Sequence, residues 1–207
     1  MYVRATTISA DPARIDDGIA FVRDSVVPAV ATLPGSLGLA MMVDRISGTT
    51  TVTTAWETEA ARSAADQVLT SLRGKAMHIM GTGTPVTQLF ELAVLDRLRP
   101  AKSGFWNRMT YVTIDPAHLD DAVDAYASST VHDLQLLPGY CSAVLLIDRT
   151  RGAGIVSITF DSKDSLEASR EQAESIRRAA IAKTGAVVSE IRESQIAIAG
   201  LRLPQTG

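Results

Sequence analysis

The chain has 207 residues, of which 46% are hydrophobic, 21% are charged and 5% are aromatic, and its formal net charge is −3. This length suits one large domain or two of about 100 residues, and the composition is typical of a soluble globular protein. The slight negative charge and the scarcity of aromatic side chains argue against a nucleic-acid-binding surface.

Two further features narrow the class of protein. Cys141 is the only cysteine, which excludes an internal disulfide and a thiolate-cluster metal site. No apolar run approaches the roughly 18 residues of a membrane span, and the N-terminus resembles no signal peptide. We therefore expect a cytoplasmic protein with no membrane or nucleic-acid partner, no metal and no cofactor.

The first half of the chain predicts the order β-α-β-β-α-β. The expected strands 2–9 and 49–56 are rich in β-branched residues, and each expected helix carries an apolar stripe at helical spacing. Asp11-Pro12 begins the first helix, Pro34-Gly35 ends it, and Pro28 predicts a kink near Val27. The expected strands are 2–9, 37–44, 49–56 and 86–95, and the expected helices begin after Asp11 and Thr58. We read Gly81-Thr82-Gly83-Thr84-Pro85 as a loop and not as a phosphate cradle.

The second half repeats the first. Leu33-Pro34-Gly35 recurs as Leu137-Pro138-Gly139, with 138 − 34 = 104, and Asp44-Arg45 recurs as Asp148-Arg149 at the same offset. Sixteen of the fifty-three positions from 4 to 56 are identical to those 104 residues later. We expect a slip of two residues further on, where Thr82-Gly83 would match Thr184-Gly185. An internal duplication is predicted, with repeats 1–98 and 105–207 and a linker over 99–104.

The predicted fold class is α+β. Two fused ferredoxin-like repeats would pack sheet to sheet as an intramolecular pseudo-dimeric α/β barrel, because each open sheet leaves one face bare. The assembly would be a monomeric pseudo-dimer or a higher homo-oligomer. Arg4 and Arg108 recur on first strands, and Glu91 and Glu193 on fourth strands, which predicts the cross-strand pairs Arg4–Glu91 and Arg108–Glu193.

The first half resembles the dimeric α/β barrel superfamily, and within it the antibiotic-biosynthesis-monooxygenase-like branch. The segments that carry this resemblance are Val26-Val27-Pro28-Ala29-Val30, Leu33-Pro34-Gly35, Gly38, Asp44-Arg45 with Gly48, and Trp56-Glu57-Thr58-Glu59-Ala60. The resemblance covers both halves and implies the fold. Members include cofactor-free oxygenases, haem-degrading enzymes, small isomerases and stress-related proteins, so it implies no single reaction.

Four residues are candidates for the chemistry that this resemblance implies. His78 could act as a general base near neutral pH, and Trp56, Tyr111 and Phe160 could form aromatic walls of a substrate pocket between sheet and helices. Each also fits a structural role, as a helix-end histidine or as packed core. No cofactor-binding residue and no metal-ligand spacing stands out.

Four functions stay open at this point. The first is a cofactor-independent monooxygenase acting on a hydrophobic aromatic small molecule, for example a polycyclic one. The second is a non-catalytic small-molecule-binding or stress-related barrel, and the third is a structural or interaction module. The fourth is a haem-binding or haem-degrading protein. This last function would require an Asn on the first strand with a Trp and a His on the second helix, and neither half assembles that triad.

Overall fold

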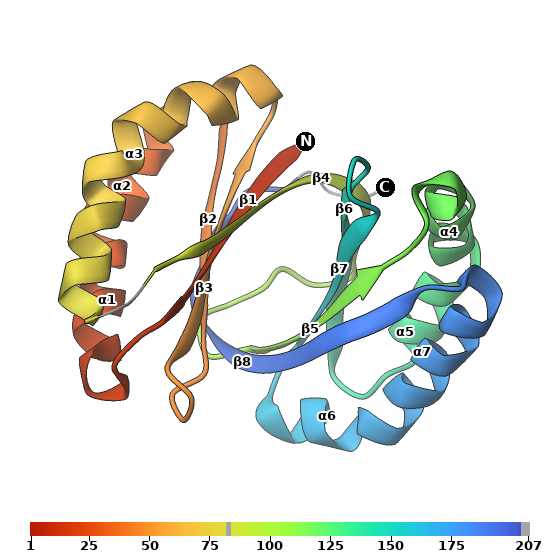
Figure 1. Cartoon of the computed structure of the whole chain (residues 1–207). Coiled ribbons are helices and arrows are strands. Elements are labelled where there is room, and N and C mark those ends of the chain that lie inside the picture. Colours follow the sequence, from red (N-terminus) through yellow and green to blue (C-terminus); the bar gives the residue numbers. More distant parts are fainter. Residues whose placement is uncertain (82–83, 204–207) are drawn as a thin grey trace. The chain divides into compact units, whose positions relative to one another are not determined.

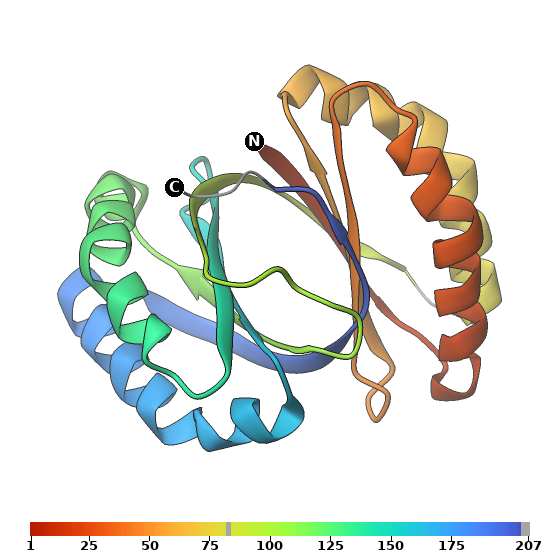
Figure 2. The same ribbon diagram turned by 180° about the vertical axis from the view of Figure 1, so that it is seen from behind.

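The computed structural model describes residues 1–81 and 84–203 and has an α+β architecture (Figures 1 and 2). Two compact units divide it. The first unit comprises Met1–Phe90 and the segment that begins at Ser194, and the second unit comprises Glu91–Glu193. The boundaries between the two units fall inside the last strand of each half. The predicted repeats 1–98 and 105–207 have other bounds, and they stay a prediction.

The first unit follows the expected order of elements. Its sheet order is β1-β3-β2-β8, and the strands pair antiparallel, from Tyr2 opposite Trp56 to Val43 opposite Gln195. Figure 1 shows its helices along one face of its strands. The elements are β1 (Tyr2–Ser9), the 3₁₀ turn η1 (Pro12–Arg14), α1 (Ile15–Phe21), the π-helical turn η2 (Val22–Val26), α2 (Val27–Ala31), β2 (Ser36–Val43), β3 (Thr49–Trp56), α3 (Glu59–Met80) and the start of β4 (Val86–Arg97).

The second unit has the same order of elements. Its sheet order is β5-β7-β6-β4, and Glu91 lies opposite Ile147. Its helices again lie along one face of its own strands (Figures 1 and 2). The elements are β5 (Trp106–Thr113), the 3₁₀ turn η3 (Pro116–His118), α4 (Leu119–Ala125), the π-helical turn η4 (Tyr126–Thr130), α5 (Val131–Gln135), β6 (Tyr140–Asp148), β7 (Ala153–Phe160), α6 (Lys163–Ala168), α7 (Arg170–Thr184) and the start of β8 (Val187–Leu201).

The first long helix of each unit changes type in the middle. A π-helical turn ends at Val26 in the first unit and at Thr130 in the second, where an α-helical segment resumes. The sequence predicts a break near Val27 because Pro28 lacks an N–H group, and the helix type does change there. His132 replaces Pro28 in the second unit, however, and the same change occurs. Proline is therefore not the general cause of this change in helix type. Pro28 is tolerated because the π-helical turn before it has already altered the backbone hydrogen bonds of the helix.

The second long helix keeps the offset of 104 to its end. α3 spans Glu59–Met80, and 163 − 59 and 184 − 80 both equal 104, so α6 and α7 together begin and end at the matching positions. Both helices are capped by a left-handed glycine, Gly81 and Gly185. The expected slip of two residues is therefore not needed at the helix end; Thr82 and Gly83, on which that expectation rested, lie outside the described residues.

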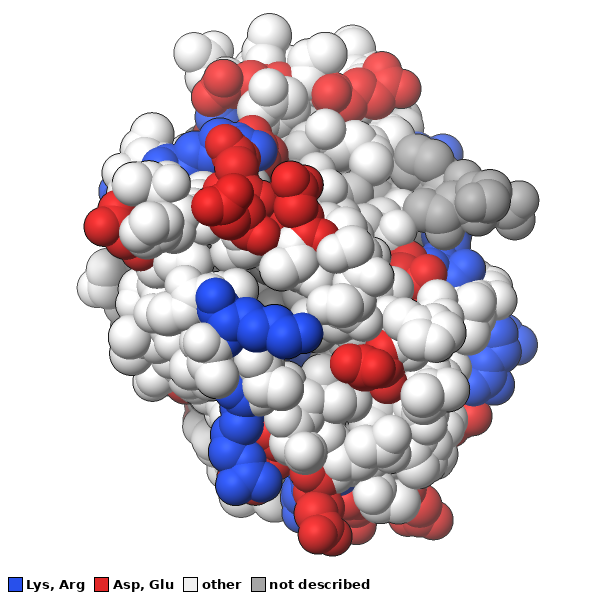
Figure 3. Space-filling view, turned by 90° about the vertical axis from the view of Figure 1, so that its right-hand side faces the viewer, with Lys and Arg blue, Asp and Glu red and all other residues white. Residues whose placement is uncertain are grey.

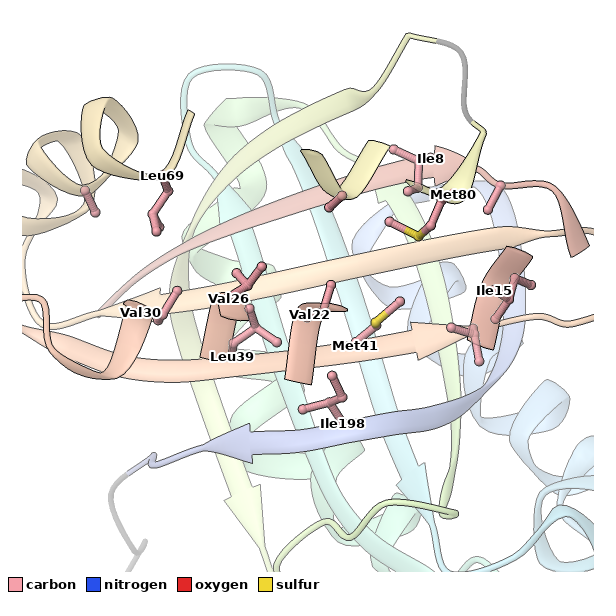
Figure 4. Close-up of a cluster of buried hydrophobic side chains, with 14 of the residues drawn as sticks. Ile8, Ile15, Val22, Val26, Val30, Leu39, Met41, Leu69, Met80 and Ile198 are labelled. Carbon is pink, nitrogen blue, oxygen red and sulfur yellow. The ribbon is translucent and has the colours of Figure 1, made fainter. Parts of the chain in front are cut away.

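The core of the first unit is closed by Met80 at the end of α3. Met80 is 1% exposed and belongs to the hydrophobic cluster drawn in Figure 4. A methyl group added at Gly18 would lie only 2.3 Å from the Met80 Cγ atom and 2.6 Å from its sulfur atom. The glycine therefore leaves the room that the methionine side chain fills, and helix α1 packs directly on α3.

We predict that Met80→Thr lowers the free energy of unfolding by about 2–5 kcal/mol, since deleting buried atoms leaves a cavity as well as a loss of burial. The control is Val68→Ala on the same helix, where the side chain is 59% exposed and the expected change is within about 0.5 kcal/mol. Urea unfolding of both variants measures the difference. Equal stability of the two variants would show that Met80 does not close the core.

Candidate functional site

A cavity of about 120 Å³ lies inside the second unit, between its sheet and its helices. Strands β5, β6 and β7 form one wall, and α4, η4, α5 and α7 form the other. The pocket predicted between sheet and helices thus has a counterpart in this unit. Most of the lining is aliphatic and includes Val112, Leu119, Val123, Leu134, Leu145, Ile147, Val156, Ile158, Ala173, Ile176 and Ile181.

The space exists because smaller side chains replace larger ones. Thr184 takes the position of Met80, and Ala173 takes the position of Leu69, each 104 residues later. Leu69 and Met80 are both buried in the core of the first unit, whereas Ala173 and Thr184 line the cavity. The atoms removed from the end and the middle of the helix are no longer available to fill the layer between helix and sheet.

Tyr126 is a change in the opposite direction, because it replaces the smaller Val22 of the first unit. It lines the cavity and is 7% exposed, and its hydroxyl oxygen is buried with no hydrogen-bond partner among the described residues. Burial, reinforced by the nearby Asp96 carboxylate, raises the pKa of the Tyr126 phenol. The group is therefore a protonated donor at neutral pH, in a place where an unmade hydrogen bond is costly.

The Asp96 carboxylate on β4 does not accept a hydrogen bond from the Tyr126 hydroxyl, because other side chains donate to both of its oxygen atoms. The Tyr140 hydroxyl donates to Asp96 Oδ2 at 2.5 Å, and the Gln135 side-chain amide donates to Oδ1 at 3.0 Å. Burial and the bond to Asp96 raise the pKa of Tyr140 as well. Two tyrosines therefore lie near one carboxylate, but only Tyr140 is bonded to it.

Arg108 contributes a buried guanidinium to the same cavity. Its Nε donates to Glu193 Oε1 at 2.9 Å, and its other nitrogens donate to the Ser169 hydroxyl at 3.0 Å and the Leu166 carbonyl at 2.8 Å. Arg170 also binds Glu193, at 2.6 Å. Burial opposes ionisation of Glu193, but its bonds to Arg170 and Arg108 outweigh burial and lower its pKa. Arg108 is thus fully engaged by the protein.

The predicted cross-strand pairs have different outcomes. Arg108–Glu193 is confirmed, but Arg4–Glu91 is wrong, since Arg4 pairs with Asp66 and Glu91 accepts from Arg149 at 2.5 Å. The register explains the error. Glu91 lies opposite Ile147 and Gln195 lies opposite Val43, so the position equivalent to Glu91 is Gln195, at 195 − 91 = 104, and not Glu193.

Arg177 on α7 also lines the cavity, and it differs from Arg108 in having no fixed partner. Within residues 1–81 and 84–203 it makes no hydrogen bond or ion pair, although the Glu174 charge acts on it from a distance. Burial and the Arg108 charge lower the pKa of Arg177 against the pull of Glu174. Because Arg177 is half-buried and Lys183 is exposed, these two cations mark the place where the cavity meets solvent.

The candidate residues from the sequence lie outside this lining. In the first unit, His78 is exposed on α3, and Trp56 is 1% exposed in the core, where its indole N–H donates to the Thr54 hydroxyl at 3.2 Å. In the second unit, Phe160 is fully buried against the Arg108 guanidinium, 5.4 Å from the ring centre. The structure therefore does not bring His78 and Phe160 into one unit, and a base role for His78 stays a prediction.

Tyr111 lies on β5 between Thr110 and Val112, both of which line the cavity. Because side chains alternate across a strand, the Tyr111 ring points to the opposite face of the sheet. There its hydroxyl accepts from Arg192 at 3.2 Å, and the Arg192 guanidinium stacks on its ring, 4.6 Å from the centre. Its role as a wall of the substrate pocket likewise stays a prediction.

Tyr126, Arg177, Ala173 and Thr184 were not predicted as site residues. The second helix lies beyond positions 4–56, over which the two halves match without a gap, and a slip of two residues would hide the replacement of Met80 by Thr184. An unbroken offset of 104 would have shown two core side chains of one repeat reduced to Ala and Thr in the other. Smaller side chains at equivalent core positions of the second repeat were the sequence signal for a cavity.

Neither a metal centre nor a membrane span appears in the described chain. Over residues 1–81 and 84–203, no cluster of three or more His, Cys, Asp or Glu side chains is arranged to hold a metal ion. None of the described helices is long and apolar enough to cross a membrane. On the face shown in Figure 3, acidic and basic side chains are interspersed among a larger number of uncharged ones.

Proteins of similar sequence occur in Mycobacterium tuberculosis. The uncharacterised protein Rv2557 is 37% identical over 205 residues, which are 99% of this chain and 91% of the relative, and the uncharacterised protein Rv2558 is 36% identical over 206 residues. No family model matches the sequence. This identity and coverage place the chain in one family with these relatives.

Solved structures show the same fold. An anthrone oxidase-like protein matches with a TM-score of 0.68 and 18% identity, covering 98% of this chain and 94% of that protein. A ferredoxin fold protein from Listeria monocytogenes, described as related to antibiotic biosynthesis monooxygenases, matches with a TM-score of 0.55 and 9% identity, covering 95% and 94%. At such low identities the likeness shows the fold alone.

We predict opposite effects of removing the two tyrosine hydroxyls. Tyr126→Phe raises the free energy of unfolding by up to about 1 kcal/mol, because it removes a buried donor that has no partner, whereas Tyr140→Phe lowers it by about 1–3 kcal/mol, because Asp96 loses its donor. Urea unfolding of both variants beside wild type measures this. A destabilisation by Tyr126→Phe equal to that by Tyr140→Phe would mean that the Tyr126 hydroxyl is bonded after all.

Proposed function

We propose that the second unit of this chain, which belongs to one family with the Mycobacterium tuberculosis protein Rv2557 and shares the fold of a protein related to antibiotic biosynthesis monooxygenases, binds a small hydrophobic, ring-containing molecule. The observation that carries this proposal is the buried Tyr126 hydroxyl, which lacks a partner at the wall of an apolar cavity. Buried polar groups in native proteins are nearly always paired, so an unpaired donor beside an open space calls for an acceptor from outside.

The volume supports a molecule with a single ring. An apolar cavity of about 150 Å³ is large enough to bind benzene, and this one measures about 120 Å³. A polycyclic substrate would have to extend beyond these walls, so the proposal narrows the ligand to one ring with an oxygen acceptor. The aliphatic lining would hold the ring, and Tyr126 would orient it through its acceptor.

The polar groups of the lining favour binding over catalysis. They are Arg108, Thr110, Tyr126, Thr130, Arg177, Lys183 and Thr184, and this set contains no His, Asp, Glu or Cys. General base catalysis needs a group that accepts a proton near the working pH. A protonated phenol, two guanidinium groups, an ammonium group and hydroxyl groups bind and orient a molecule more readily than they deprotonate one.

A cofactor-independent oxygenase is the second candidate, and the fold it shares with the anthrone oxidase-like protein supports it. In this scheme an ionised aromatic substrate would pass electrons directly to O₂. His78 as the base and Trp56, Tyr111 and Phe160 as walls belong to this proposal. Haem binding remains a third reading without support from the cavity lining.

We also infer that the two units arose by internal duplication and close together as a pseudo-dimeric barrel. The constant offset of 104 in the sequence and in the helix bounds supports this history. After a duplication, one copy can keep a filled core while the other opens a cavity. That would explain why Met80 and Thr184 occupy equivalent positions.

We predict that the double variant Ala122→Gly/Thr184→Met abolishes ligand binding. It copies the Gly18 and Met80 pair of the first unit, so a methionine side chain would fill the cavity from the end of α7. Both changes are required, because a methionine there needs the space that a glycine leaves. Titration of fluorobenzene followed by ¹⁹F NMR measures binding to wild type and variant.

The control for this experiment is His78→Ala, an exposed site in the first unit, and we expect it to bind like wild type. Fluorobenzene binding that persists in the folded double variant would place the site elsewhere. Loss of fluorobenzene binding in the His78→Ala variant would indicate that the ligand binds in the first unit, and it would favour the oxygenase scheme.

A further inference from the structure

A comparison of the two units shows how the charges beside the second long helix have changed. In the first unit Arg4 and Arg73 share one carboxylate, because Asp66 pairs with Arg4 and accepts from Arg73 at 2.9 Å. Arg108 and Arg177 are the same two arginines 104 residues later. At the position of Asp66, however, stands Arg170, so the shared carboxylate has been replaced by a third cation.

Glu193 on β8 compensates only part of this change. Its two oxygens are taken by Arg108 and by Arg170. Glu193 thus pairs with two of the three guanidinium groups. Arg177 forms no hydrogen bond or ion pair within the described residues, because the nearby Glu174 pairs with Arg178 and acts on Arg177 only from a distance. Its counterpart Arg73 is held in place, whereas Arg177 is not.

This unpaired cation lies at the cavity and not on an open surface. Arg177 and Arg108 both line it, and burial and the Arg108 charge lower the pKa of Arg177 against the pull of Glu174. An anion inside the cavity would favour the charged form of Arg177. It would also give Arg177 a carboxylate partner, as Asp66 does for the equivalent Arg73 in the first unit.

We propose that the ligand of the second unit is a small carboxylic acid with one ring, whose carboxylate binds Arg177 while its ring occupies the apolar cavity. This inference rests on the proposed function and assigns the chemical class of its ligand. A guanidinium group matches a planar carboxylate with two parallel hydrogen bonds. Arg177 and the exposed Lys183, at the place where the cavity meets solvent, both favour an anionic group there.

The test compares two probes of equal shape, 4-fluorobenzoate and 4-fluorobenzamide, titrated into the full chain at pH 7.5 and followed by ¹⁹F NMR. Wild type binds the benzoate about tenfold more tightly than the benzamide. Arg177→Gln removes this preference by weakening benzoate binding about tenfold, and it leaves benzamide binding unchanged. Arg73→Gln, the matched change in the first unit, leaves both affinities as in wild type.

A second variant tests the same idea with Arg177 intact. Arg170→Asp restores a carboxylate at the position of Asp66, so Arg177 gains an internal partner and benzoate binding weakens while benzamide binding does not. Equal binding of both probes by wild type, or a benzoate preference that survives Arg177→Gln, would overturn the inference and leave the proposed function standing. Failure of wild type to bind either probe would overturn both.

Discussion

Packing at the last turn of the second long helix decides what each unit can do. In the first unit Met80 reaches across to Gly18, and the layer between helices and sheet is filled. In the second unit Thr184 ends the helix at the equivalent place, and the layer holds a cavity. Because protein interiors are packed as densely as organic crystals, the loss of a few methylene groups at one level is enough to open a cavity.

Two polar groups around the cavity lack a hydrogen-bond or ion-pair partner among the described residues. Tyr126 adds a hydroxyl at a position where the first unit has Val22, and no partner was added with it. Arg170 replaces Asp66, which leaves Arg177 without the carboxylate that its counterpart uses. In a folded core such unpaired groups are a cost, and selection retains a cost of this kind where it serves binding. The Tyr126 hydroxyl and the Arg177 guanidinium at the walls of this apolar cavity are the features on which the proposed ligand-binding role rests.

Much of the fold follows from the sequence. The strand from Thr49 to Trp56, the helix that begins after Thr58 and the turn at Gly48 occur where local patterns predict them. These features depend on capping, turn geometry and alternation, all of which are local. The pairing of Arg4 with Asp66 was not predictable in this way, because it depends on which helix turn faces β1 and on strand register.

The candidate site was harder to predict for a physical reason. His78, Trp56, Tyr111 and Phe160 attract attention as aromatic or titratable side chains, but their positions reflect packing and exposure in the fold. A cavity is made by atoms that are missing, and a sequence records those only through comparison with a copy that retains them. Ala173 and Thr184 carry no chemical signal until they are aligned with Leu69 and Met80.

The central claim is that one unit holds an apolar cavity at a position where the other is filled. Crystallography of the protein under xenon pressure tests it most directly, because xenon enters apolar cavities without needing a specific ligand. The account predicts xenon density in the second unit between Ala173, Leu145 and Ile147, and none beside Met80 in the first unit. Xenon beside Met80, or an unoccupied second unit, would contradict it.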